Sequence, residues 1–262
     1  MTGWTRQNAW GRATLFAVFG FLYVPIAVLV ALSFNEAGLP TVWSGFSTKW
    51  YGALLGNANI LGAAWNTLIV AVFATVIATV LGTMLAIGIE TRRRASTGLE
   101  ALVFAPMVIP DIVLAVALLS FFSRLDVTLG LHTIVLSHVI FDLAFVCSIV
   151  RARLKHFDYS IVEASRDLGA SPWTTFWRVT FPVLMPAIVA GALLAFTLSI
   201  DEFIIAFFTA GAGRSSITLP MQIYSMIRFG ITPEINALAT IVMSVSAAAL
   251  LLSQWLNKDQ MR

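Results

Sequence analysis

The sequence predicts an all-α integral membrane protein with six transmembrane helices. Apolar residues make up 59% of the chain and charged residues 11%, whereas a soluble globular domain carries about a quarter charged residues. The apolar residues fall into six runs, and a helix needs about 20 residues to cross the hydrocarbon core of a bilayer. Six such helices use most of the 262 residues. We therefore expect a single transmembrane domain over 1–262, with its core at about 60–256.

The six apolar runs define the predicted spans. They lie at approximately 13–33, 63–89, 99–122, 132–150, 183–208 and 234–256. The first run is about 20 residues long, whereas the apolar core of a signal peptide has 7–15, so we interpret it as a retained span. Residues 34–62 form the first external loop, in which Thr48 to Leu55 fits a short amphipathic helix.

The starts of three spans are also marked in the sequence. Span two is expected to begin at Asn66-Thr67, and its glycines Gly82 and Gly88 allow close approach of a neighbouring helix. Spans three and five are expected to begin at the proline pairs Pro106-x3-Pro110 and Pro182-x3-Pro186.

The distribution of basic residues predicts the orientation in the membrane. If the N-terminus is cytoplasmic, 12 of the 16 Lys and Arg residues lie on the cytoplasmic side. Cytoplasmic loops carry an excess of Lys and Arg, so both termini are predicted to be cytoplasmic, as is a polar loop at about 156–182. The basic residues lie at membrane borders rather than on one folded face, so no nucleic-acid partner is expected.

The cytoplasmic loop is predicted to form two short helices joined by a tight turn. Ser160 and Glu163 have the spacing of a capping box, so the first helix is expected to begin at Ser160. Gly169 suits the left-handed residue that ends a helix. Ser171 followed by Pro172 suits a second helix start.

Four acidic residues lie within the apolar runs, namely Asp111, Asp142, Asp201 and Glu202. Each costs on the order of 2.5–3.5 kcal/mol near the bilayer centre, so each is a candidate to meet a cationic substrate. Asp201 and Glu202 are neighbours, and helix neighbours point about 100° apart, so one is expected to face a central path and the other a partner helix. The alternative is a structural role, as a helix-start carboxylate for Asp111 and beside His138 for Asp142.

No catalytic or metal-binding pattern is found in the sequence. The only cysteine, Cys147, lies in an apolar run, and the three histidines are scattered. The loop from Gly211 to Ser216 lacks the spacing of a phosphate-binding loop, and we interpret it as an external turn. We therefore expect no enzymatic activity and no metal site in this chain.

The cytoplasmic loop resembles the EAA loop of ATP-binding-cassette (ABC) importer permeases. That loop reads E-A-A, three residues, Gly, nine residues, I-x-L-P, and here Ser165, Val179 and Phe181 depart from it. In the family, the helical pair docks into a groove on the ATPase subunit and transmits its closure. The resemblance implies coupling roles for Glu163, Ala164, Ser165, Asp167, Gly169, Pro172 and Pro182. The aromatic residues of the second helix also fit the alternative of an interfacial helix on lipid head groups.

Other segments are similar to the spermidine/putrescine permease subfamily. They include Ala195 to Phe203 and Thr218-Leu219-Pro220, while Asn66-Thr67-Leu68 resembles the opening of the conserved core of type I binding-protein-dependent permeases. The resemblance implies a type I importer in the bacterial inner membrane, with two permease subunits that are usually different chains. It also implies an ATPase dimer that binds the ATP, an external substrate-binding protein, a polyamine substrate, and no cofactor on this chain.

Two other functions are open on the sequence. A permease of the same class can carry another cationic solute. An ion-coupled secondary transporter can use intramembrane carboxylates as proton relays, and it would work without an ATPase.

Overall fold

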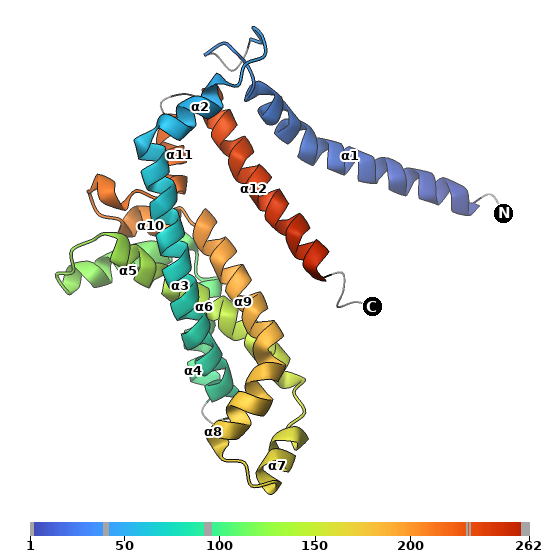
Figure 1. The fold of residues 1–262 in the computed structure, drawn as a ribbon, viewed down its shortest axis with the longest axis vertical. Helices are drawn as coiled ribbons and strands as arrows, with labels where there is room; N and C mark the ends of the chain where they lie inside the picture. Colours follow the sequence, from blue (N-terminus) through green and yellow to red (C-terminus); the bar gives the residue numbers. More distant parts are fainter. Residues whose placement is uncertain (1–2, 39–41, 92–95, 229, 231, 258–262) are drawn as a thin grey trace. The chain divides into compact units, whose positions relative to one another are not determined.

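The structure is a computed structural model of the chain and describes residues 3–38, 42–91, 96–228, 230 and 232–257. Their regular secondary structure is helical, apart from an isolated bridge between Asn35 and Phe46 (Figure 1). The helices are α1 (Gly3–Leu32), α2 (Lys49–Gly56), α3 (Ala58–Thr91), α4 (Ser96–Val108), α5 (Asp111–Arg124), α6 (Leu131–Lys155), α7 (Ser160–Asp167), α8 (Pro172–Thr175), α9 (Phe181–Asp201), α10 (Ile204–Thr209), α11 (Leu219–Arg228) and α12 (Pro233–Asn257). The predicted all-α class is confirmed.

The described residues form two units. One is drawn from 1–61 and 223–262 and contains α1, α2 and α12; the other is drawn from 62–222 and contains most of α3 and all of α4 to α10. Both candidate sites lie in the second unit.

Four helical segments are long and apolar enough to cross a membrane: Trp10–Leu32, Ala58–Thr91, Leu131–Lys155 and Pro172–Asp201. The bent pair formed by α4 and α5 gives a fifth if it is counted as one span. Within α12, residues Pro233–Val245 form a shorter apolar helix. By their length and composition the described helices fit a membrane protein with several spans, while the count of six stays a prediction.

The predicted third span is wrong as a single helix. α4 ends at Val108, α5 begins at Asp111, and the two are bent by 111°. Pro110 lies at the break in an extended conformation, with φ −55° and ψ 136°. Proline has no N–H for the helix ladder and disfavours helical geometry in the residue before it, so the helix stops there.

The second span begins earlier than the predicted Asn66. α3 starts at Ala58, where the side-chain oxygen of Asn57 accepts hydrogen bonds from the N–H groups of Asn59 (3.1 Å) and Ile60 (3.4 Å). Asparagine is a favoured residue at this position because its side chain satisfies N–H groups that the helix leaves free. The short helix predicted in the external loop is confirmed as α2.

Three helices of the second unit meet at Val146 of α6. A Cβ atom added to Gly82 of α3 would lie 2.9 Å from the Val146 Cβ and 3.0 Å from the Leu143 carbonyl oxygen. A Cβ atom on Gly191 of α9 would lie 3.4 Å from the Val146 Cα. Glycine at position 82 therefore lets α3 approach this valine closely, while the distance at Gly191 is that of an ordinary van der Waals contact.

The ends of α3, α4 and α6 are joined by an ion cluster. The Arg151 guanidinium lies 2.6 Å from a carboxylate oxygen of Glu100 and 3.5 Å from one of Glu90. It also lies 5.8 Å from the centre of the Phe104 ring. These side chains are partly buried, which strengthens their attraction relative to fully solvated pairs.

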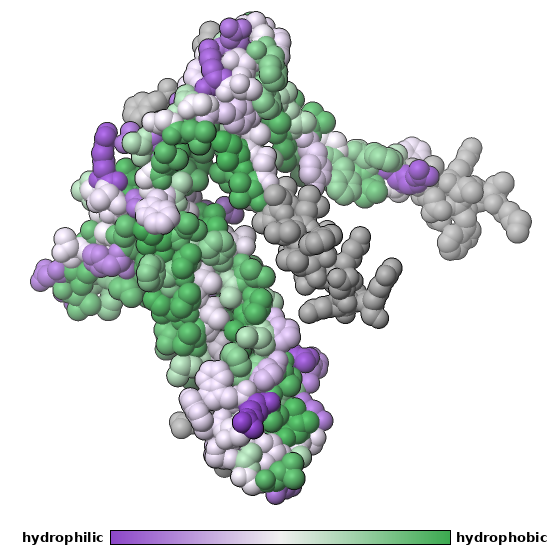
Figure 2. Space-filling view, viewed as in Figure 1, coloured by the Kyte–Doolittle hydropathy of each residue, from purple (hydrophilic) through white to green (hydrophobic). Residues whose placement is uncertain are grey.

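The outward surface of α3 is apolar, as Figure 2 shows in green. Its exposed large side chains include Leu68, Val72, Phe73, Val76, Val80 and Met84. Such a surface suits a helix in contact with lipid.

Replacing Gly82 by alanine should destabilise the protein, because the new methyl group collides with Val146 and a backbone carbonyl. Overpacking of a core typically costs about 1–3 kcal/mol, so the melting temperature of the purified protein in detergent should fall. Gly88→Ala on the same helix is the matched control, since nothing lies within 4 Å of its added Cβ atom. Equal melting temperatures for the two variants would contradict the tight packing.

Candidate functional site

The cytoplasmic loop forms the predicted helical pair. α7 spans Ser160–Asp167, α8 spans Pro172–Thr175, and a π-helical turn at Phe176–Thr180 leads into α9. The pair lies at one end of the second unit, beyond the adjoining end of α9 (Figure 1). π-helical turns occur often at functional sites.

The predicted capping box at the start of α7 is wrong. The residue before the helix is Tyr159, which makes no side-chain cap, and the N–H of Ser160 donates to Asp158 Oδ1 at 3.0 Å. Asp158 therefore accepts the bond from the Ser160 N–H that the spacing assigned to the Glu163 side chain, while the Glu163 N–H donates to the Tyr159 carbonyl at 3.2 Å. Side-chain and backbone hydrogen bonds from Ser160 hold the pKa of the exposed Asp158 carboxyl below its usual value.

The predicted end of α7 at Gly169 is confirmed. Gly169 has φ +83° and its N–H donates to the Arg166 carbonyl at 2.8 Å, while the Ala170 N–H donates to the Ser165 carbonyl at 3.1 Å. These two bonds make a Schellman motif. Nothing lies within 4 Å of an added Cβ atom at Gly169, so within this chain glycine is required by the backbone conformation and not by crowding.

The second helix starts as predicted at Ser171 and Pro172. Ser171 Oγ accepts a hydrogen bond from the Thr174 N–H at 3.2 Å, and proline occupies the first turn. Ser165 Oγ lies 3.0 Å from Thr175 Oγ1 and thus ties α7 to α8. The serine that departs from the E-A-A pattern therefore adds a bond between the two helices.

The helical pair exposes apolar side chains. Leu168 is 89% exposed, Trp173 70% and Trp177 45%. The rings of Trp173 and Trp177 contact each other edge to face with their centres 5.6 Å apart. Exposed apolar groups gathered in one place mark a surface that binds a partner.

The other residues predicted for coupling lie around this pair. Glu163, Ala164 and Asp167 are exposed on α7. Pro182 is exposed in the first turn of α9. Glu163 also lines a cavity of about 360 Å³. Ile87 of α3 and Leu154 of α6 line it as well, so the cavity lies between the helical pair and the ends of these two helices.

The two adjacent acids of span five do not lie on one helix. α9 ends at Asp201, Glu202 is extended with φ −68° and ψ 120°, and a separate helix α10 begins at Ile204. The predicted continuous span to residue 208, and the 100° relation between the two acids, are both wrong.

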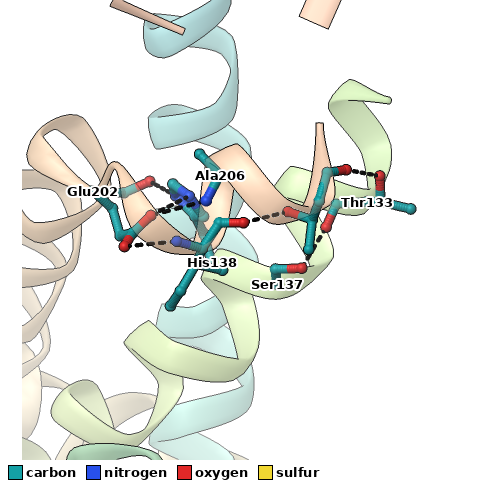
Figure 3. Close-up of polar contacts among 8 residues, drawn as sticks. Thr133, Ser137, His138, Glu202 and Ala206 are labelled. Carbon is teal, nitrogen blue, oxygen red and sulfur yellow. Dashed lines mark hydrogen bonds and ion pairs between the residues drawn. The ribbon is translucent and has the colours of Figure 1, made fainter. Parts of the chain in front are cut away.

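The reason for the break is the carboxylate of Glu202. Its Oε1 accepts a hydrogen bond from the Ile205 N–H and its Oε2 from the Ala206 N–H, each at 3.0 Å (Figure 3). The first N–H groups of a helix have no partner within it, and a negative charge is favourable at that end. Glu202 therefore caps α10.

His138 of α6 joins this break, a contact that the sequence did not predict. Its Nδ1 lies 2.7 Å from Ser199 Oγ, and its Nε2 lies 3.7 Å from Glu202 Oε2 (Figure 3). All three side chains are nearly or fully buried. The available signal was a histidine inside an apolar run, but the partner expected for it was Asp142.

The remaining acids lie in different surroundings. Asp142 is fully buried, and neither of its carboxyl oxygens has a hydrogen-bond partner among the described residues. Asp111 and Asp201 are exposed, with Asp111 in the first turn of α5 as the helix-start alternative expects. The structure therefore brings Glu202 to His138, while no hydrogen bond or ion pair among the described residues joins Asp111, Asp142 or Asp201 to these two side chains. In the described part of the chain, no cluster of His, Cys, Asp or Glu has a metal-binding arrangement.

The chain is similar to known transport proteins. A family model described as "Binding-protein-dependent transport system inner membrane component" matches residues 78–260. The spermidine/putrescine transport system permease protein PotC of Escherichia coli (strain K12) is 40% identical over 245 residues, which cover 93% of this chain and 92% of PotC. The putrescine transport system permease protein PotI of the same strain is 42% identical over 245 residues, covering 90% and 86%.

Solved structures of low sequence identity share the fold. A chain of a bacterial ABC transporter involved in the import of the acidic polysaccharide alginate superposes with a TM-score of 0.77 at 16% identity, and the match covers 98% of each chain. A chain of the MetNI methionine ABC transporter gives a TM-score of 0.62 at 18% identity, covering 74% of this chain and 92% of that one.

Asp142→Asn should leave the melting temperature of the purified protein unchanged or raise it. An ionised carboxylate buried without a partner costs several kcal/mol, so the group is expected to be buried as a neutral acid, which an amide resembles in shape. Glu202→Gln is the comparison, because its amide can accept only one of the two N–H bonds, and hydrogen bonds to a charged group contribute about 1.5–3 kcal/mol each. A large loss of stability in Asp142→Asn alone would show that Asp142 is ionised and paired.

Proposed function

The chain belongs to the family of binding-protein-dependent transport system inner membrane components, and we propose that it is the permease subunit of an ATP-driven importer for polyamines. It is a multi-pass protein of the inner membrane. The observation that carries the substrate class is the identity of 40–42% over nine-tenths of the chain to permeases named for spermidine and putrescine.

The proposed assembly contains this chain, a second related permease, an ATPase dimer and an external binding protein. ATP would be bound and hydrolysed by the ATPase, so this chain needs no cofactor and carries no catalytic residue. We propose six spans with both termini in the cytoplasm, in keeping with the excess of Lys and Arg at the cytoplasmic borders.

The helical pair α7–α8 is the proposed contact with the ATPase. The exposed Leu168 and Trp173 supply apolar area for docking, and the Ser165–Thr175 bond keeps the two helices together as the ATPase moves. Closure of the ATPase dimer on ATP would displace the pair and, through the π-helical turn, the start of α9. The reset after hydrolysis would return the path to its inward-open form.

The intramembrane acids are proposed to serve the cationic substrate. Asp201 and Asp111 are exposed in the isolated subunit, so their carboxylates can attract an ammonium group in a region of low dielectric constant. Glu202 and Asp142 are proposed to lie along the same path, Glu202 with its carboxylate held by two backbone N–H groups and Asp142 as a buried acid.

Deleting this chain should abolish uptake of labelled putrescine or spermidine in cells that have no other polyamine importer. The wild-type chain should restore uptake, and Asp201→Asn should restore much less. The half-saturating concentration should stay constant, because the external binding protein sets it. Uptake that does not depend on the chain would reject the polyamine assignment, and a screen of other cationic solutes against the binding protein would follow.

Two substitutions at Gly169 distinguish a need for space at the ATPase contact from a need for the backbone conformation. Alanine is small but disfavours φ +83° by roughly 1–2 kcal/mol. Asparagine tolerates this conformation better but is larger. If the ATPase packs against Gly169, Asn should lower the uptake per ATP hydrolysed more than Ala does. The opposite order would show that only the backbone conformation matters.

A further inference from the structure

The short helix α10 is held against α6 at both ends. It has six residues, Ile204–Thr209, whereas isolated helices below about 12–15 residues are marginal even in favourable sequences. Its conformation must therefore come from its surroundings. Ile205 and Ala206 are fully buried, and they pack in apolar clusters with residues of neighbouring helices such as Leu118 and Ile134.

The two polar anchors of α10 come from α6. At the C-terminal end, Thr133 Oγ1 donates to the Thr209 carbonyl at 2.7 Å. At the N-terminal end, His138 Nδ1 lies 2.7 Å from Ser199 Oγ, in the last turn of α9. Its Nε2 makes no hydrogen bond among the described residues and faces the Glu202 carboxylate, which caps α10, at 3.7 Å. Figure 3 shows these side chains of α6 directed toward the α9–α10 segment.

The two adjacent acids at the N-terminal end of α10 have different roles. The Glu202 carboxylate is occupied by two backbone N–H groups and faces His138. Asp201, one residue earlier, is exposed at the end of α9. The position of the break decides which acid caps α10 and which is exposed. If the helix continued through Glu202, the two acids would be neighbours on one helix, about 100° apart, and Glu202 could not cap α10.

We propose that His138 is a positioning residue of the transport path. By contacting Ser199 and Glu202 together, it fixes the chain break directly after Asp201. Glu202 is thereby assigned to capping α10, and Asp201 is the acid that meets the ammonium group of the substrate. This inference rests on the proposed function, since it names the working acid of the same path.

The first experiment tests by cysteine labelling, without any transport measurement, whether His138 holds α10 in place. In a chain with Cys147→Ala, Ala206→Cys reports on α10, because Ala206 is fully buried and its N–H binds Glu202. His138→Leu should raise the rate at which a thiol reagent labels this cysteine by about tenfold, as expected when local opening becomes easier. His138→Gln, which keeps a polar group near Glu202, should restore much of the protection.

The matched control is His132→Leu, since His132 is exposed on the same helix. It should leave the labelling rate unchanged. If His138→Leu also leaves the rate unchanged, the anchoring is overturned whatever the substrate is.

The role in transport is then tested in the complete importer with its binding protein. His138→Leu should lower the maximal uptake rate severalfold while half-saturation and ATP hydrolysis persist, and His138→Gln should recover part of the rate. Asp201→Asn should give the same pattern, and the double variant should be no worse than Asp201→Asn alone, because both changes remove one function.

The outcomes separate the two proposals. Additive losses, or normal uptake in His138→Leu, would overturn the positioning role. If the wild-type importer carries no polyamine, the proposed function fails, while the labelling experiment still decides whether His138 anchors the break.

Discussion

Backbone N–H and C=O groups within a membrane must form their hydrogen bonds inside the protein. This constraint determines how the helices of the second unit can begin and end. A bilayer core offers no water to free N–H and C=O groups, so each interruption of a helix needs a side chain that takes over the missing bonds. Glu202 does this for two N–H groups of α10, and Thr133 does it for the Thr209 carbonyl. The chain can break its helices at these points because side chains nearby form the hydrogen bonds that the helices lose.

This requirement changes how polar residues in apolar runs are interpreted. An intramembrane acid is expected to serve function by default, yet Glu202 has a structural task that its sequence neighbour Asp201 does not share. His138 serves the same task from another helix. The buried Asp142 is different again, because no described residue hydrogen-bonds its carboxyl group. Three acids with similar sequence surroundings thus have three different environments.

The sequence predicted well what depends on nearby residues. The turn at Gly169 follows from bonds within residues 165–170, and the membrane class follows from composition. The capping box was predicted wrongly because Asp158, only two residues from Ser160, accepts the hydrogen bond from the Ser160 N–H. The contact of His138 with the break at Glu202 could not be predicted in this way, since His138 and Ser199 are 61 residues apart and meet only in the folded chain. The stop at Pro110 was visible as a proline, but proline is also tolerated near helix starts.

One helix connects the proposed ATPase contact to the proposed substrate site. α9 follows the helical pair at Phe181 and ends at Asp201, and its 21 residues span roughly 30 Å at about 1.5 Å per residue. Near its middle, Gly191 packs closely on Val146, which α3 also contacts through Gly82. On the proposed function, a displacement of the end of α9 that contacts the ATPase would be passed along the helix as a tilt about Val146, because a tightly packed crossing resists compression. The break at the far end of α9 would then turn that tilt into a movement of Asp201 relative to α10. On this proposal, the packing at Val146 serves both the stability of the protein and the coupling of the ATPase contact to the substrate site.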